Sequence, residues 1–204
     1  MNISLKVDNI ASSRGYSQLF SGLTFTVTAG QVFVIDGDNG SGKSTLLKII
    51  AGLRKPDKGA IFWNGKSVAD IQAEFCRQMV WLGHRNGLNP ALTARENIES
   101  FNCLFKTNTV GLGYLLDKVG LTGLANLPVR QFSEGMKRRL ALTRLMTKTA
   151  RLWLLDEPQS ALDRGGVRML EQLIHEHVAN QGMVIMSSHH DIQLQHIQTQ
   201  YLYL

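Results

Sequence analysis

The chain of 204 residues is long enough for one large domain or two small ones, and its 44% hydrophobic and 19% charged residues form an ordinary globular composition. It contains no apolar run approaching the roughly 20 residues of a membrane span, and its N-terminal segment lacks the apolar region of a signal peptide. The net charge of +6 suits an anionic ligand, an anionic lipid surface or nucleic acid, without choosing among them.

Strands and turns are expected in the N-terminal part of the chain. Apolar patterns predict strands at residues 3–7, 23–28 and 31–36, followed by a helix at residues 43–53 that Gly52 ends. Residues 59–66 predict a strand and a tight turn, with Asn64 and Gly65 as the turn signal. Another short apolar run occupies residues 78–83.

The spacing of apolar residues becomes helical between residues 93 and 118, where Thr93 and Glu96 form a capping box. A basic helix is expected at residues 134–148. Apolar runs at residues 151–158 and 182–190 end in polar clusters, which is typical of central parallel strands whose carboxyl ends face a site. The helical stretch between strands predicts an α/β core with a helical subdomain.

The segment "DGDNGSGKST", residues 36–45, follows a strand and precedes a helix. It satisfies the Walker A pattern G-x-x-x-x-G-K-[ST]. Its glycines let backbone N–H groups converge on an anion, and the helix directs its positive N-terminal end at the same point. Lys43 is expected to contact the β- and γ-phosphates, and Ser44 to ligate Mg²⁺. The predicted nucleotide-binding residues of this loop are Gly37, Asp38, Asn39, Gly40, Ser41, Gly42, Lys43, Ser44 and Thr45.

The run "RLWLLDEP" has the Walker B arrangement, a buried strand that delivers a carboxylate to the metal. Asp156 is expected to hold Mg²⁺ through water. Glu157, one residue later, is the candidate general base for the attacking water. An ordinary strand that ends in solvated acids has the same local pattern, and the Walker A loop is what favours the catalytic interpretation.

The segment "FSEGMKRRLALTRL", residues 132–145, precedes Walker B. It resembles the signature motif of ATP-binding cassette proteins, which usually reads L-S-G-G-Q before a basic helix. Ser133 and Gly135 match that motif, whereas Phe132, Glu134 and Met136 depart from it. A hydroxyl and free N–H groups at a helix start can bind a phosphate, although Ser133 alone is equally a helix N-cap.

The resemblance to ATP-binding cassette proteins extends over most of the chain. It implies a single domain, residues 1–204, with a P-loop NTPase fold of mixed sheet core, an N-terminal antiparallel β subdomain and an inserted helical subdomain at about 88–148. "SALD" resembles the family's D-loop, which makes Asp163 a nucleotide-site residue. His189 occupies the place of the switch histidine, and His190 is its neighbouring alternative.

Two positions depart from the family pattern. His84 stands where the family has the Q-loop glutamine; a histidine can bond a lytic or metal-bound water but ligates Mg²⁺ poorly. The aromatic residue that stacks on adenine is also not evident. Tyr16 is the nearest ring and Arg14 can stack instead, so both remain candidates.

Two other patterns indicate no separate chemistry. Cys76 and Cys103 lack metal-ligand spacing and are expected to be reduced thiols. His175 and His177 lie two residues apart on an expected helix, where side chains do not face each other, so a solvated surface is predicted there.

The resemblance implies an ATPase that uses ATP and Mg²⁺ and works as a head-to-tail homodimer on integral membrane permease subunits. The expected location is peripheral, at the cytoplasmic side of the inner membrane. The motifs are most similar to the haem-exporter ATPases of bacterial cytochrome c maturation, which bind no haem themselves. A soluble cassette ATPase acting on nucleic acid or ribosomes is the alternative, as is a transporter for another substrate; because such soluble relatives usually carry two cassettes or long insertions, no nucleic acid partner is expected.

Overall fold

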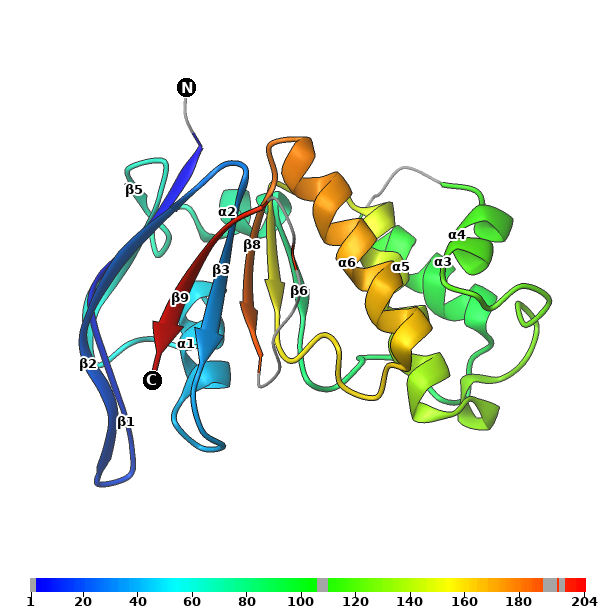
Figure 1. The fold of residues 1–204 in the computed structure, drawn as a ribbon, viewed down its shortest axis with the longest axis horizontal. Helices are drawn as coiled ribbons and strands as arrows, with labels where there is room; N and C mark the ends of the chain where they lie inside the picture. The colour runs from blue at the N-terminus through cyan, green and yellow to red at the C-terminus, as the bar shows by residue number, and fades with distance from the viewer. Residues whose placement is uncertain (1–2, 106–109, 189–193, 195–196) are drawn as a thin grey trace.

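The protein, shown in Figure 1 as a computed structural model, is described at residues 3–105, 110–188, 194 and 197–204. Its elements in chain order are β1 (Ser4–Arg14), β2 (Ser17–Thr28), β3 (Gln31–Asp36), α1 (Lys43–Ile50), β4 (Lys58–Trp63), β5 (Lys66–Ser67), α2 (Gln72–Gln78), β6 (Met79–Leu82), α3 (Ala94–Phe105), α4 (Leu112–Lys118), the 3₁₀ turn η1 (Val129–Gln131), α5 (Glu134–Thr147), β7 (Leu152–Leu155), α6 (Arg164–Ala179), β8 (Met183–Ser187) and β9 (Gln198–Tyr203).

The N-terminal sheet is antiparallel, with strand order β2-β1-β4-β5. The β4–β5 connection is the expected tight turn, because Asn64 and Gly65 both have positive φ, 50° and 80°. That pair of values is typical of a two-residue hairpin turn. Helix α1 ends as predicted near Gly52, whose φ is +71°.

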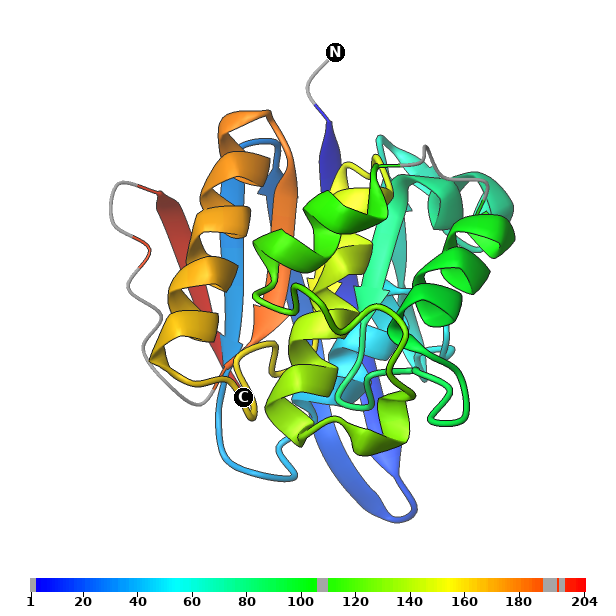
Figure 2. The ribbon, with the colours of Figure 1, turned by 90° about the vertical axis from the view of Figure 1, so that its right-hand side faces the viewer.

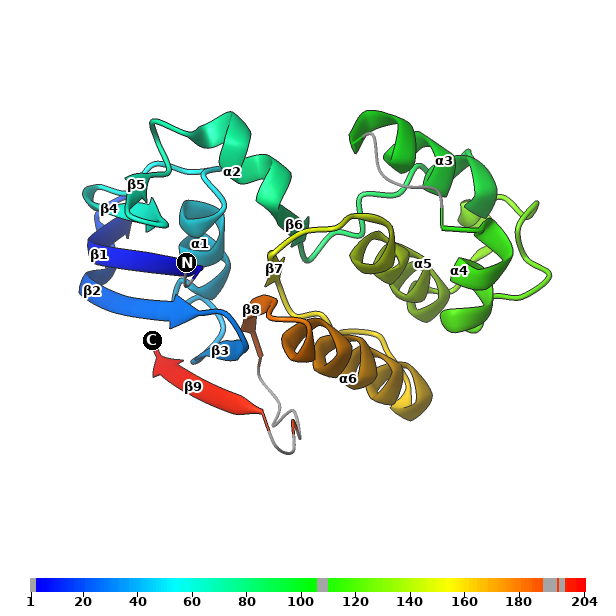
Figure 3. The ribbon, with the colours of Figure 1, turned by 90° about the horizontal axis from the view of Figure 1, so that it is seen from above.

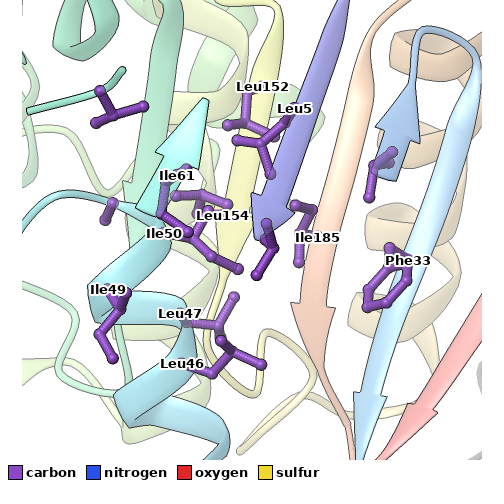
Figure 4. Close-up of a cluster of buried hydrophobic side chains, with 14 of the residues drawn as sticks. Leu5, Phe33, Leu46, Leu47, Ile49, Ile50, Ile61, Leu152, Leu154 and Ile185 are labelled. Atoms are coloured by element: carbon purple, nitrogen blue, oxygen red, sulfur yellow. The ribbon is translucent and has the colours of Figure 1, made fainter. Parts of the chain in front are cut away.

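The second sheet is parallel, with strand order β6-β7-β8-β3-β9. Its inner strands are apolar on both faces, as buried parallel strands must be. Along β7, Leu152 and Leu154 enter the core shared with α1 and the N-terminal sheet, whereas Trp153 and Leu155 enter the core under α5 and α6. Figure 4 shows the first of these cores, with Leu5 from β1 near Leu152 from β7. Because β7, β8 and β3 are adjacent parallel strands, their carboxyl ends meet at one edge of the sheet.

Helices α3, α4 and α5 lie together beside the parallel sheet (Figure 3). They have an apolar core of their own, which includes Ile98, Leu115 and Leu140. Figure 2 shows this group facing the viewer next to α6. The capping box at α3 is formed as expected: the Thr93 N–H donates to Glu96 Oε2 at 2.7 Å, and the Glu96 N–H donates to Thr93 Oγ1 at 3.2 Å. A separate core fits the predicted helical subdomain at about 88–148, and the exact domain limits stay a prediction.

The α/β fold with antiparallel, parallel and helical parts is confirmed, and the two kinds of strand pairing occupy separate sheets. Three elements were not predicted: the 3₁₀ turn η1, helix α2 and strand β9. Helix α2 is short, and β9 alternates weakly but pairs with β3 along its whole length. Within the part of the chain that the structure describes, no helix is both long and apolar enough to span a membrane.

Candidate functional site

The loop between β3 and α1 is built from glycine conformations. Gly37, Gly40 and Gly42 have φ of 141°, 90° and 111°, in the region that side chains rarely adopt. Gly42 is the N-cap of α1, and a Cβ there would lie 3.0 Å from a ring carbon of Phe20. The turn therefore requires positive φ at all three glycines, and Gly42 is also required for its close packing. The turn leaves backbone N–H groups at the start of α1 for an anion.

Lys43 is enclosed by this loop and is only 5% exposed. Its ammonium donates to the carbonyl oxygens of Gly37 at 2.6 Å and Asp38 at 2.9 Å. The Asp36 carboxylate accepts from the Gly37 N–H at 2.6 Å. A buried cation is thereby held at the place where phosphate charge is expected. The Asp36 carboxylate is hydrogen-bonded to the backbone of the next residue.

The Walker A and Walker B motifs meet at the Asp156 carboxylate, although they are 112 residues apart in sequence. The Ser44 hydroxyl donates to Asp156 Oδ1 at 2.9 Å. The Ser187 hydroxyl, at the end of β8, donates to the same oxygen at 2.8 Å and accepts from the Glu157 N–H at 2.9 Å. Asp156 itself is 2% exposed. Buried carboxylate and hydroxyl oxygens at one point are the donor set that Mg²⁺ prefers.

Glu157 follows Asp156 with a φ of 46°, which is uncommon for a residue with a side chain. Its side chain lines a cavity of ≈ 240 Å³ together with Lys43 and Ser44 of the phosphate loop. His84 Nδ1 lies 3.7 Å from Glu157 Oε2. The two candidate proton acceptors that the structure describes are therefore neighbours.

The remaining lining of this cavity distinguishes the two adenine candidates. Arg14 lines the cavity together with Asn39 and Thr45. Tyr16 lies on the turn between β1 and β2, fully exposed and outside that lining. The geometry favours Arg14 in this conformation, and the identity of the adenine contact stays a prediction.

The signature residues lie outside the cavity of their own chain. Ser133 is the N-cap of α5 and accepts from the Met136 N–H at 3.2 Å. A Cβ on Gly135 would lie 2.8 Å from the carbonyl oxygen of Ala161, so the glycine allows α5 to approach the loop after β7. Asp163 caps α6 through the Gly166 N–H and pairs with Arg139.

These contacts lower the pKa of Asp163: the backbone hydrogen bond from Gly166 is the largest cause, and the hydrogen bond from Arg139 comes next. The D-loop position is thus occupied by a capping residue whose carboxylate is bound within its own chain. Its role toward nucleotide stays a prediction.

His189 and His190 lie outside the described residues. The interpretation of His177 as solvated was wrong: its ring stacks on Trp153 with centroids 3.9 Å apart, and burial lowers its pKa from 6.5 to about 4. The reason is tertiary, because α6 packs on the face of β7 that carries Trp153. No group of three or more metal-binding side chains was found among the described residues.

Two residues beside Asp156 and Glu157 were missed. A serine pair at a strand end is common, so the sequence does not single out Ser187, whose importance comes from the pairing of β8 with β7. The sequence predicts Arg138 only as part of a basic helix, but it is 2% exposed and donates to the backbone around Glu157. No signal in the sequence separates Arg138 from its basic neighbours.

The family model described as ABC transporter matches residues 20–160 of this chain. The cytochrome c biogenesis ATP-binding export protein CcmA of Nitrosococcus oceani is 40% identical over 197 residues, which cover 96% of this chain and 90% of that protein. The protein of the same name from Haemophilus influenzae is 38% identical over 196 residues, covering 95% and 92%.

Solved structures agree on the fold. A putative ABC transporter ATP-binding protein from Pyrococcus furiosus has a TM-score of 0.83 at 23% identity, covering 98% of this chain and 97% of that one. An ATP-binding cassette solved as a dimer in a post-hydrolysis state with ADP and Pi has a TM-score of 0.82 at 25% identity, covering 98% and 94%. With its Walker A loop, Walker B carboxylates and signature helix in place, the chain belongs to the ABC transporter family and is an ATP-binding cassette ATPase.

Proposed function

We propose that this chain is the ATP-hydrolysing subunit of a membrane transporter that serves cytochrome c maturation, and that it acts as a head-to-tail homodimer. The names of its relatives, which describe cytochrome c biogenesis and export, support the first part. The position of Ser133 and Gly135, outside the cavity of their own chain, supports the second. The expected place of work is the cytoplasmic face of the inner membrane, on integral membrane subunits.

Hydrolysis is derived from the residues around the cavity. The Lys43 ammonium and the N–H groups at the start of α1 bind the phosphates of ATP. Ser44 and Asp156 fit Mg²⁺ by their oxygen donors, and the bound ion would neutralise charge on the phosphate oxygens. Glu157 accepts a proton from the attacking water, whose oxygen bonds to the γ-phosphorus as the bond to the ADP oxygen breaks. ADP and inorganic phosphate are the products.

A larger cavity of ≈ 640 Å³ lies between the α2–β6 region and the helices α3 and α5. Its lining is mainly apolar and includes the exposed side chains of Leu104 and Phe105. Two cations lie over its aromatic rings: Arg144 is 5.1 Å from the Phe101 ring centroid, and Lys148 is 4.9 Å from that of Phe105. An amphipathic helix with an acidic end fits such a groove, and we assign it to a membrane subunit.

We infer that docking at this groove is coupled to ATP hydrolysis through segment 83–87, which lies between the groove and the ATP cavity. Gly87 lines the groove and accepts from Arg144 at 2.6 Å. Three residues earlier, His84 contacts Glu157. A partner that shifts Gly87 therefore also shifts a side chain next to the candidate base, which gives a short physical path from docking to hydrolysis.

The test is co-purification from solubilised membranes with the membrane subunits encoded beside the gene. We expect the chain to partition to membranes only when those subunits are co-expressed. The variant Leu104→Glu, with a charge in the groove, should lose this association yet keep its ATP affinity. The variant Tyr114→Glu, an equivalent change at an exposed position on α4 outside the groove, should associate normally.

Two results would count against the proposal. Wild-type association of Leu104→Glu would remove the groove from the interface. Sedimentation of the chain with ribosomes or nucleic acid, without any dependence on membrane subunits, would instead support a soluble cassette ATPase that acts on those partners.

A further inference from the structure

Arg138 is a fully enclosed cation in the second turn of α5. It is 2% exposed, and its partners are four backbone carbonyls and one side-chain amide oxygen. A guanidinium has five N–H donors in a rigid plane. All five are used here, so the position is specified for arginine rather than for any positive charge.

Three of these bonds converge on consecutive carbonyls at the end of β7. Arg138 Nη2 donates to Asp156 O at 2.9 Å and Glu157 O at 2.7 Å, and Nε donates to Pro158 O at 3.0 Å. Successive carbonyls of an extended strand point in opposite directions and cannot meet one donor group. They meet here because Glu157 adopts a φ of 46°.

The other two bonds reach the segment that carries His84. Arg138 Nη1 donates to Gly83 O at 2.9 Å and to Asn86 Oδ1 at 3.1 Å. The same side chain therefore fixes the backbone on both sides of the His84–Glu157 contact. The pKa of Arg138 is lowered by burial to about 10, and the charges of Asp156 and Glu157 oppose that shift. It stays protonated at neutral pH.

We propose that Arg138 is a positioning residue for ATP hydrolysis, which holds the left-handed turn at Glu157 so that the carboxylate faces the phosphate loop. This inference rests on the proposed function of Glu157 as general base. Left-handed residues with side chains persist only where their surroundings impose the conformation. Without the guanidinium, three carbonyls lose their shared donor and the turn can relax toward ordinary φ.

The first measurements are ATP affinity and steady-state turnover of Arg138→Met and Arg138→Lys. Lysine keeps the charge but has three donors on one nitrogen and cannot reproduce the five bonds. We expect kcat to fall by about 10–100-fold in both variants, because small displacements of a catalytic group have effects of that size. The ATP dissociation constant should change by less than about threefold, since Lys43 and the phosphate loop are untouched. Arg168→Met, at an exposed arginine on α6, is the matched control and should keep normal turnover.

The second measurement separates positioning from a general structural effect. In single-turnover assays, Arg138→Lys is combined with Glu157→Gln. If arginine acts through Glu157, the double variant should be slower than Glu157→Gln alone by less than about twofold. A merely structural role predicts multiplied losses and a parallel fall in ATP affinity.

The outcomes are distinct. Wild-type kcat in Arg138→Lys, or multiplied losses in the double variant, overturns the positioning role. If Arg138→Met fails to fold, Arg138→Lys carries the comparison alone. Normal turnover of Glu157→Gln removes the base assignment itself, whereas slow Glu157→Gln with normal Arg138→Lys removes only this inference.

Discussion

Two loops at the same edge of the parallel sheet bring the ATP site together, and they are built by different means. The phosphate loop after β3 reaches positive φ with glycines and encloses its own lysine. The loop after β7 reaches positive φ at Glu157 and Ala161, which carry side chains. Contacts from α5 hold that second loop: Arg138 at one end and the close approach of Gly135 at the other. The first conformation is local, and the second is imposed by another part of the molecule.

The largest expected effect is at the first loop. Lys43→Ala removes the enclosed cation, so phosphate charge is no longer compensated in a partly desolvated loop. We predict weak ATP binding and undetectable hydrolysis, measured by nucleotide titration and phosphate release. Normal ATP affinity in this variant would contradict the Walker A assignment.

The second loop should separate chemistry from binding. Glu157→Gln keeps the shape but cannot accept the proton, and we predict a loss of about 10²–10⁴ in turnover with ATP binding retained. ATP should then accumulate in a closed dimer, which size-exclusion chromatography with and without ATP detects. Turnover near wild type would transfer the role of base to His84 or His189.

Glycine-to-alanine changes test the local origin of the first loop. Gly42→Ala places a side chain at a φ of 111° and against Phe20, so we predict a loss of about 2–4 kcal/mol in the free energy of unfolding, together with weaker ATP binding. The converse change, Ala161→Gly in the second loop, should alter stability by less than about 1 kcal/mol, because relief of strain and gain of unfolded-state entropy oppose each other. Denaturant titration measures both. Equal losses in the two variants would contradict the contrast between the loops.

The smallest effect concerns acid stability beside the second loop. His177 supports β7 through Trp153, and burial lowers its pKa to about 4. The unfolded chain takes up a proton below pH 6.5, but the folded chain does so only near pH 4. The contribution of neutral His177 to the free energy of unfolding is therefore fully present above pH 6.5. It is lost as the pH drops toward 4, by about 1–2 kcal/mol.

His177→Phe keeps the ring stacking without the titration, and its control is His175→Phe on the same helix. Denaturant titrations at several pH values should show a flatter profile for His177→Phe than for wild type between pH 6.5 and 4. An unchanged slope would mean that His177 is not the group responsible.

Sequence reasoning located the first loop completely and the second in part. The glycine spacing of Gly37 and Gly42 around Lys43 specifies a backbone path by itself, so the phosphate loop could be read directly. Asp156 and Glu157 were found because an apolar run ended in acids. Arg138 and Ser187 were missed because neither residue type nor spacing distinguishes them, and their partners are more than 15 residues away in sequence.

The sequence by itself determined the strands with apolar residues on both faces, the capped helices and the glycine loop, because each depends on neighbouring residues and on short-range sterics. Only the tertiary structure decided that β9 joins the sheet beside β3, that His177 stacks on Trp153, and that Arg138 meets three successive carbonyls. These features depend on which surfaces pack together after the chain has folded. Strand partners and the burial of a charge are properties of that packing, and a local sequence pattern does not specify them.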